Sequence, residues 1–191
     1  MLFRSGGRAW LGIGAGWNAE ESAGLGLPFP PLAERFERLE ETLQICRQMW
    51  SDSEEPYRGT HYTLERTLNA PQPLHRPKIL IGGGGEKKTL RFVARYADAC
   101  NVFARDDVAH KLDVLREHCD AEGRPYDEIE KTAQVVLDVG DKGEKVDEFL
   151  AELQRLAGLG IQAVQGKLPN VWDPERMAVF AREVIPAAAE L

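Results

Sequence analysis

The chain has 191 residues, which is enough for one domain of ordinary size. Its net charge of −7 gives no general attraction to nucleic acid or to an anionic membrane, and no apolar run approaches the roughly 20 residues that a membrane span requires. Three cysteines without a CxxC pair argue against a disulfide framework and favour a reducing compartment. We therefore expect a single cytoplasmic domain, 1–191, that binds neither nucleic acid nor a membrane.

Short apolar segments along the whole chain predict strands. The five predicted strands are 9–13, 78–81, 99–103, 133–139 and 161–164. Helical periodicity fills the intervals between them, most regularly in an apolar stripe that predicts a helix from Leu32 to Trp50. Gly123 is expected to end a later helix, and Asp173 with Pro174 to begin the last one. This alternation predicts an α/β fold with a parallel sheet whose strands are buried on both faces.

Two intervals break the alternation. The interval 24–31 is rich in Gly and Pro and is predicted to be a loop. The interval 51–77 is polar, and Pro71 and Pro73 forbid a continuous helix there. We expect it to be an insertion that carries a hairpin or bulged loop at 57–62 and forms part of a lid. The residues of the lid that are candidates to face a substrate are Tyr57, His61 and Tyr62.

The strongest motif is a buried strand that runs into glycines and then into a helix, in the order Ile81-Gly82-Gly83-Gly84-Gly85-Glu86-Lys87-Lys88-Thr89. Without Cβ atoms the backbone can approach an anion closely, and the free N–H groups of the first helical turn then point at it. A phosphate is the natural ligand. The motif is neither a P-loop nor GxGxxG, because Lys87 and Lys88 occupy the third-glycine positions. The alternative is a tight turn without a ligand.

A second motif, Gly12-Ile13-Gly14-Ala15-Gly16-Trp17-Asn18, alternates glycines at the end of the first predicted strand. Alternate residues share one face, so the glycines leave space there for a flat ring, and Trp17 can form one side of that space. The alternative is a barrel interior that a neighbouring side chain fills. Both motifs follow the carboxyl ends of parallel strands, where cofactors bind, so they belong to one edge of the sheet. A site for a phosphate beside a site for a flat ring indicates a flavin-like cofactor.

No other chemistry competes with this prediction. The sequence contains no catalytic triad, zinc spacing or Walker motif, and its four histidines are scattered without metal-ligand spacing. No metal site is therefore predicted. Asp106 and Asp107 are expected to cap the helix that follows them.

The stretch 6–21 resembles the luciferase-like monooxygenases, in particular the group that depends on the deazaflavin coenzyme F-420 (F420). Further stretches with the same resemblance are 27–31 with Glu34 and Arg35, the helix end at Met49-Trp50, 59–62, 79–85, 95–101, and 173–176 with Phe180-Ala181. The family fold is a (β/α)₈ barrel with an insertion, typically of about 250 residues. The resemblance implies that this chain is the C-terminal part of such a barrel, about strands 4–8, and lacks strands one to three.

The resemblance also implies the positions of the cofactor. Its phosphate is expected at Gly83, Gly84, Gly85 and Glu86, after the barrel's sixth strand. Its ring is expected beside Gly14, Ala15 and Gly16, with Asn101 at the end of the seventh strand. F420 is the expected cofactor, and FMN is the alternative. Acid–base residues of the family often come from the first two strands, so no catalytic residue is assigned in this chain.

The implied function is an oxidoreductase or monooxygenase that transfers hydride or inserts oxygen into a small organic substrate. Activity is expected to be impaired in this chain, and the full-length protein is expected to be a homo-oligomer. The alternative is a non-catalytic module that binds a phosphate ligand or a partner subunit. A third possibility, a Rossmann-like sugar-nucleotide protein, requires an acidic residue at the end of the next strand, where Asn101 and Phe103 stand instead.

Overall fold

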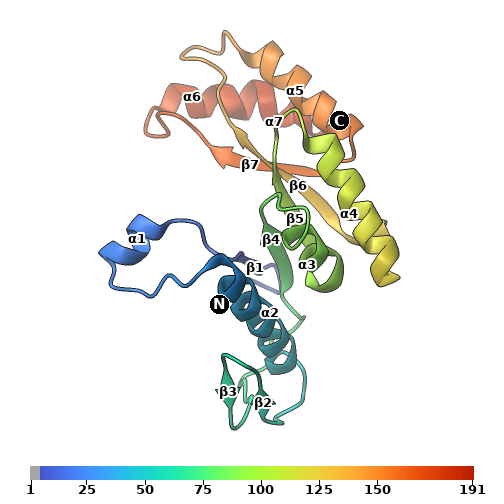
Figure 1. Cartoon of the computed structure of the whole chain (residues 1–191). Coiled ribbons are helices and arrows are strands. Elements are labelled where there is room, and N and C mark those ends of the chain that lie inside the picture. The colour runs from blue at the N-terminus through green and yellow to red at the C-terminus, as the bar shows by residue number, and fades with distance from the viewer. Residues whose placement is uncertain (1–4) are drawn as a thin grey trace.

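The computed structural model of the protein describes residues 5–191 (Figure 1). Its main sheet has five parallel strands in the order β1-β4-β5-β6-β7. The strands are β1 (Trp10–Ile13), β4 (Lys78–Gly82), β5 (Ala99–Phe103), β6 (Glu130–Val136) and β7 (Ala163–Lys167). The prediction of an α/β fold with the parallel sheet of a partial barrel is confirmed.

The strand count corrects one detail. Because β1 pairs directly with β4, no strand lies between them in the sheet. If β1 is a barrel's fourth strand, the glycine run after β4 follows the fifth strand and not the sixth. Asn101 then lies on the sixth strand and not on the seventh.

Helices follow the strands along the chain. The longer ones are α2 (Leu32–Met49), α3 (Thr89–Tyr96), α4 (Val108–Glu122) and α5 (Val146–Gly158). The shorter ones are α1 (Ala19–Gly24), η1 (Tyr126–Glu128), α6 (Pro174–Val179), the π-helical turn η2 (Phe180–Val184) and α7 (Ile185–Ala188). No helix within residues 5–191 combines the length and the apolar character that crossing a membrane requires.

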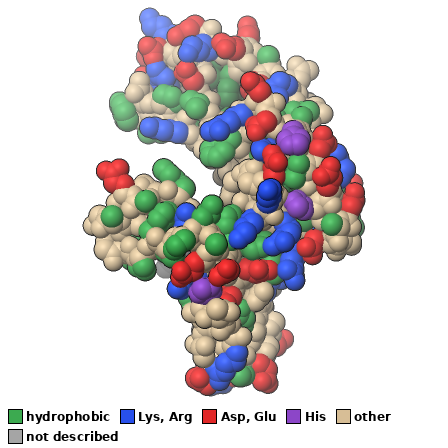
Figure 2. Space-filling view, viewed as in Figure 1, with side chains coloured by type: hydrophobic (Ala, Val, Ile, Leu, Met, Phe, Trp, Pro, Cys, Tyr) green, Lys and Arg blue, Asp and Glu red, His purple; other side chains and the backbone are tan. Residues whose placement is uncertain are grey.

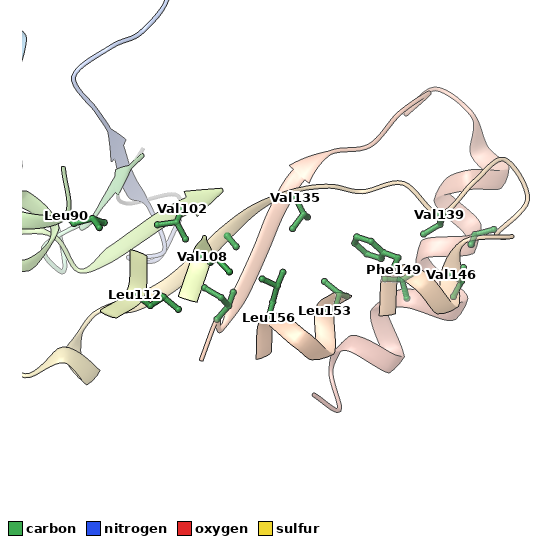
Figure 3. Packing of buried hydrophobic residues seen from close by; sticks show 14 residues of the cluster. Leu90, Val102, Val108, Leu112, Val135, Val139, Val146, Phe149, Leu153 and Leu156 are labelled. Carbon is green, nitrogen blue, oxygen red and sulfur yellow. The ribbon is translucent and has the colours of Figure 1, made fainter. Parts of the chain in front are cut away.

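The helices bury one face of the sheet in two apolar clusters. One cluster packs Ile79 and Ile81 of β4 against α2, α3 and α4. The other joins Val102 and Val135 to α4, α5 and η2, and Figure 3 shows its side chains filling the space between strands and helices. Each strand therefore presents alternate residues to this core.

The opposite, concave face of the sheet lacks such a cover. Trp10 is 41% exposed, Phe103 51% and Val136 66%, and the last two alternate with core residues on their strands. The prediction that the strands are buried on both faces is therefore wrong for β1, β5 and β6, and β1 is in addition an edge strand with half-exposed residues. The physical reason is that nothing among the described residues packs on the concave face.

Several local predictions are confirmed by the backbone. Gly123 ends α4 with φ +65°, and Asp173 caps α6 by accepting the N–H of Glu175, with Pro174 at the first helical position. Asp107 holds the N-cap position of α4 but forms no capping bond, because its carboxylate pairs with Lys111. The predicted loop 24–31 is confirmed from residue 25 on, whereas α1, which lies before it, was not predicted; its N-cap Asn18 accepts the N–H of Glu21 at 3.0 Å.

The interval 51–77 carries a hairpin, β2 (Tyr57–Arg58) with β3 (Thr63–Leu64), as predicted. Glu41 of α2 holds it, because its carboxylate accepts the N–H groups of Thr60, His61 and Tyr62 at 2.6 to 3.1 Å. Figure 1 shows the hairpin at the far end of α2, well away from the arm that carries α1. The lid function of this interval stays a prediction.

Candidate functional site

A cavity of about 910 Å³ lies at the carboxyl ends of β1, β4, β5 and β6. Segment 12–17, the segments 82–83 and 101–103, and the side chains of Phe36 and Gln134 form most of its wall. None of its lining residues comes from 51–77. Both glycine motifs therefore border one cavity at one edge of the sheet. Figure 2 shows the molecule opened by a hollow between the α1 arm and the lobe of α5 to α7.

The floor of the cavity is cleared by glycines on two neighbouring strands. A Cβ atom at Gly12 or Gly82 would meet no atom within 4 Å. A Cβ atom at Gly14 would lie 3.5 Å from the carbonyl oxygen of Gly82, so the two strands approach closely there. The backbone at Gly12 and Gly82 is therefore open to the cavity.

Arg35 of α2 fixes the segment that follows β1. Its guanidinium donates to the carbonyl oxygens of Ala15, Gly16 and Pro30 and stacks on the Phe29 ring, 4.1 Å from the centroid. Gly16 has φ +77°, a conformation that glycine adopts without strain. One side chain thus holds the whole turn at the end of β1.

The glycine run after β4 forms a loop before α3 begins. The N–H of Gly83 is not available to a ligand, because it donates to the carbonyl oxygen of Asn101 at 2.9 Å. The five following N–H groups, from Gly84 to Lys88, donate to no acceptor within residues 5–191. Since α3 starts at Thr89, these amides belong to the loop and not, as predicted, to the first helical turn. A row of free amides is a site for an anion.

The structure brings five of the eight predicted site residues to the cavity wall. These are Gly14, Ala15, Gly16, Gly83 and Asn101. Gly84, Gly85 and Glu86 are not among the lining residues; Gly84 faces Lys111 of α4, and Gly85 faces Thr89 of α3.

Glu86 makes its contacts with α4 and not with the cavity. Its carboxylate pairs with Lys111 at 2.5 Å and with His110 at 3.2 Å, and its carbonyl oxygen lies 2.7 Å from Nε2 of His118. The hydrogen bond from Lys111 lowers the pKa of this carboxyl below its ordinary value. We interpret Glu86 as the residue that fastens the loop to α4.

Asn101 belongs to a small polar group on the concave face. Its amide lies 3.0 Å from the hydroxyl of buried Thr132 and 3.4 Å from Gln134, and the Thr132 hydroxyl is 2.7 Å from the carbonyl oxygen of Cys100. Sequence reasoning missed Gln134, although it stands two residues after Thr132 on one strand. The sequence could have indicated it, because residues 132 and 134 of one strand must point to the same face of the sheet.

The remaining candidates lie elsewhere. Tyr57 and His61 line a separate polar hollow with Glu37, Glu40 and Glu41. Tyr62 lines a smaller hollow on the other side of the segment 14–16. Within residues 5–191 no group of three or more His, Cys, Asp or Glu side chains is arranged to hold a metal ion.

The thiols are buried and not activated. Burial raises the pKa of Cys100 to about 11, and burial also raises the pKa of Cys46 and of Cys119. A thiol with such a pKa stays protonated near neutral pH, so these residues are poor nucleophiles.

Comparison with known proteins gives consistent results. The sequence pattern of the family described as luciferase-like monooxygenase matches residues 4–187. The F420-dependent glucose-6-phosphate dehydrogenase of Kineococcus radiotolerans is 31% identical over 182 residues, which are 93% of this chain and 52% of that protein. The pyrimidine monooxygenase RutA of Acinetobacter baylyi is 34% identical over 104 residues, 53% of this chain and 28% of RutA. The chain thus spans about half the length, or less, of these curated relatives.

Two solved structures share the fold. An F420-dependent secondary alcohol dehydrogenase, in complex with an F420-acetone adduct, superposes with a TM-score of 0.77 at 18% identity, covering 95% of this chain and 70% of that one. The F420-dependent tetrahydromethanopterin reductase of Methanopyrus kandleri gives a TM-score of 0.76 at 17% identity, and the superposition covers 95% of this chain and 75% of the reductase chain.

Proposed function

The chain belongs to the luciferase-like monooxygenase family, and on that premise we propose that it binds the phosphate-bearing cofactor of an oxidoreductase. The proposed cofactor is F420, with FMN as the alternative, and the proposed substrate is a small organic molecule. Support for F420 comes from the relatives, since an F420-dependent dehydrogenase aligns with 93% of this chain.

The observation that carries the proposal is the row of free amides from Gly84 to Lys88. Backbone N–H groups without a protein acceptor are satisfied by an anionic ligand, and the start of α3 adds its dipole. Lys88 adds a positive charge, because its Nζ lies 5.3 Å from the centroid of Phe36, a cavity residue. The loop therefore has the donors and the charge that a phosphate group requires.

The cavity fits the rest of such a cofactor. Its volume of about 910 Å³ falls within the range of small-molecule sites, about 300–1,000 Å³. The space that Cβ atoms would fill at Gly12 and Gly82 is free, and Phe36 and Trp17 supply aromatic surface. A planar ring is thereby accommodated near the amides that hold the phosphate.

When bound, a deazaflavin or flavin supplies hydride transfer or oxygen activation, and the protein orients it and excludes water. The described residues serve the first of these tasks, because the glycine loop and the floor fix the cofactor's two ends. They exclude water only in part, because the concave face of the sheet is open. We propose that turnover by this chain alone is impaired for that reason.

A second candidate function is supported by the chemistry of the side chains that line the cavity. None of the cavity-lining residues has a carboxylate, imidazole, amine or thiol side chain. The described part of the cavity therefore offers binding groups without an acid or a base. This favours, as the alternative, a non-catalytic module that holds a phosphate ligand or a partner subunit.

Fluorescence titration of the chain with F420 and with FMN tests the proposal. We expect saturable binding of F420 that the substitution Gly82→Leu weakens strongly, because the leucine fills the open floor. Gly158→Ala on α5, where a Cβ atom also meets nothing within 4 Å, is the matched control and should bind normally. Equal binding by all three proteins would refute the proposed ring position, and absence of binding of both cofactors would refute the function.

A further inference from the structure

A second hollow, of about 320 Å³, lies at the amino ends of the strands, at the opposite end of the sheet from the cofactor cavity. Arg76 and Asp98 mark its place, because they stand just before β4 and β5. Arginine dominates its lining, which includes Arg47, Arg76, Arg95, Arg124, Asp98 and Glu128. We call it the arginine hollow. Four guanidinium groups share this small space with two carboxylates.

Ion pairs leave much of the hydrogen-bonding capacity of these arginines unused. The pairs are Arg76 with Asp98, Arg124 with Glu128, and Arg95 with Glu40 and Glu122, which lie outside the hollow. Arg47 is exposed, and its guanidinium has no hydrogen bond, ion pair or ring contact within residues 5–191. Among the same residues, no acceptor is bound by Nε of Arg76, Nη2 of Arg95 or Nη2 of Arg124. Because each guanidinium has five N–H donors, the donors of the hollow outnumber its acceptors.

Helix ends explain part of this cluster. The helices α2, α3 and α4 all end beside the hollow, and the carboxyl end of a helix favours a cation. Arg124 meets this need at α3, because its Nη1 donates to the carbonyl oxygens of Val93, Ala94 and Ala97 at 2.7 to 3.4 Å. No backbone carbonyl oxygen of the described residues accepts from Arg47 or Arg95. Capping of the helices therefore does not account for these two arginines.

We propose that the arginine hollow binds a phosphate group, either free or at the end of a small molecule. The planar fork of a guanidinium matches the oxygens of a phosphate or a carboxylate. The four arginines come from α2, the segment before β4, α3 and the turn after α4, so their donors reach one point from separate elements. A tetrahedral anion accepts from several directions, whereas the oxygens of a carboxylate lie in one plane. The site is separate from the cofactor cavity and does not rest on the proposed function.

Equilibrium dialysis of the chain against radiolabelled inorganic phosphate, at constant ionic strength, tests this inference. Arg47→Gln removes the unpaired guanidinium, and Arg182→Gln, at a surface arginine that lies 3.7 Å from Glu183, is the matched control. The loss of hydrogen bonds to a charged group predicts about ten-fold weaker phosphate binding by Arg47→Gln. Arg182→Gln should bind as the unaltered chain does. Arg95→Gln replaces the first variant if thermal melts show that Arg47→Gln does not fold.

Competing anions identify the ligand class. Methyl phosphate that displaces the label as well as phosphate does would show that the site accepts phosphate esters, and failure to displace it would show a site for free phosphate. Both results support the inference. Acetate that competes as strongly as phosphate would overturn the assignment to a phosphate group.

The glycine loop after β4 is a second place where phosphate is expected, and Gly84→Val distinguishes the two sites. A loss with Arg47→Gln that Gly84→Val does not share supports the arginine hollow, as do two classes of site that are each lost in one variant. A loss with Gly84→Val alone would support the proposed cofactor loop and overturn this inference. Absence of saturable binding, or equal weakening by Arg47→Gln and Arg182→Gln, would also overturn it.

Discussion

At the scale of single residues, charged side chains at the amino ends of the strands hold the sheet together. Asp98 accepts the N–H of Ile79 at 2.8 Å and a two-pronged contact from Arg76. Burial of Asp98 alone would raise its pKa, but the hydrogen bonds from Arg76 and Ile79 outweigh that effect, so the pKa lies below its ordinary value. Asp98 is therefore a structural residue that joins the start of β4 to the start of β5.

Replacing Asp98 by Asn is expected to lower the free energy of unfolding by roughly 1–2 kcal/mol at pH 7, because the pair is partly solvated. A carboxyl with a depressed pKa in the folded state stabilises fully above its unfolded pKa of about 3.9 and loses that contribution as the pH falls through the folded value. Urea melts at pH 7 and pH 3 should show the difference between the two proteins shrinking in acid. An Asp113→Asn control, on the exposed side of α4, should melt normally.

At the scale of elements, α2 positions the turn after β1 through one arginine. Removing Arg35 by Arg35→Ala deletes its bonds to three carbonyl oxygens and its stacking on Phe29. We expect a loss of about 2–3 kcal/mol of stability and weaker cofactor binding, since the segment 14–16 is a wall of the cavity. Thermal melts and titrations of this variant beside Arg116→Ala, a surface arginine of α4, check both effects. Unchanged melting of Arg35→Ala would contradict the role given to it.

The order of strands and helices could be predicted because parallel strands leave strong signals. Apolar runs that end in glycine, such as the one before Gly82, have few alternative structures. The sequence predicts that β6 starts at residue 133, three residues after its observed start at Glu130, because the charged residues Glu130 and Lys131 are typical of a loop. Glu130 pairs with Lys78 on the concave face, while Lys131 packs on Tyr126, and neither contact is visible in the sequence.

The candidate site could be predicted in position but not in detail. Glycine spacing places both motifs at one sheet edge, because strand direction fixes where they meet. Which N–H groups are free depends on the loop's path, and the sequence does not show that Gly83 bonds to Asn101. The contacts of Arg35 and Glu86 also required three-dimensional information, since their partners lie on other elements.

At the scale of the whole molecule, the sheet formed by residues 5–191 has two unpaired edges and an open concave face. Among these residues β1 pairs only with β4, and β7 only with β6. Large apolar side chains are exposed, including Trp17 at 87% and Trp172 at 79%. Unpaired edges and apolar faces favour association with other chains.

The purified 191-residue chain is therefore expected to self-associate or to unfold over a broad temperature range with binding of a hydrophobic dye. Domain stability is normally only about 5–15 kcal/mol, so an uncovered sheet face is a large deficit. Light scattering and a dye-monitored melt measure both properties. A monodisperse monomer with one sharp transition would show that the open sheet is stable as it stands.

We propose that the free amides of the loop after β4 hold the phosphate of the cofactor, and a titration of F420 into the chain and into Gly84→Val tests this proposal. A Cβ atom at Gly84 would lie 3.6 Å from the Lys111 stem, so the valine methyl groups should press on Lys111 and displace the loop that carries the amides. We expect saturable F420 binding by the unaltered chain, about ten-fold weaker binding, or still weaker, by Gly84→Val, and no change in Gly158→Ala. Equal affinity of Gly84→Val and the unaltered chain would contradict it.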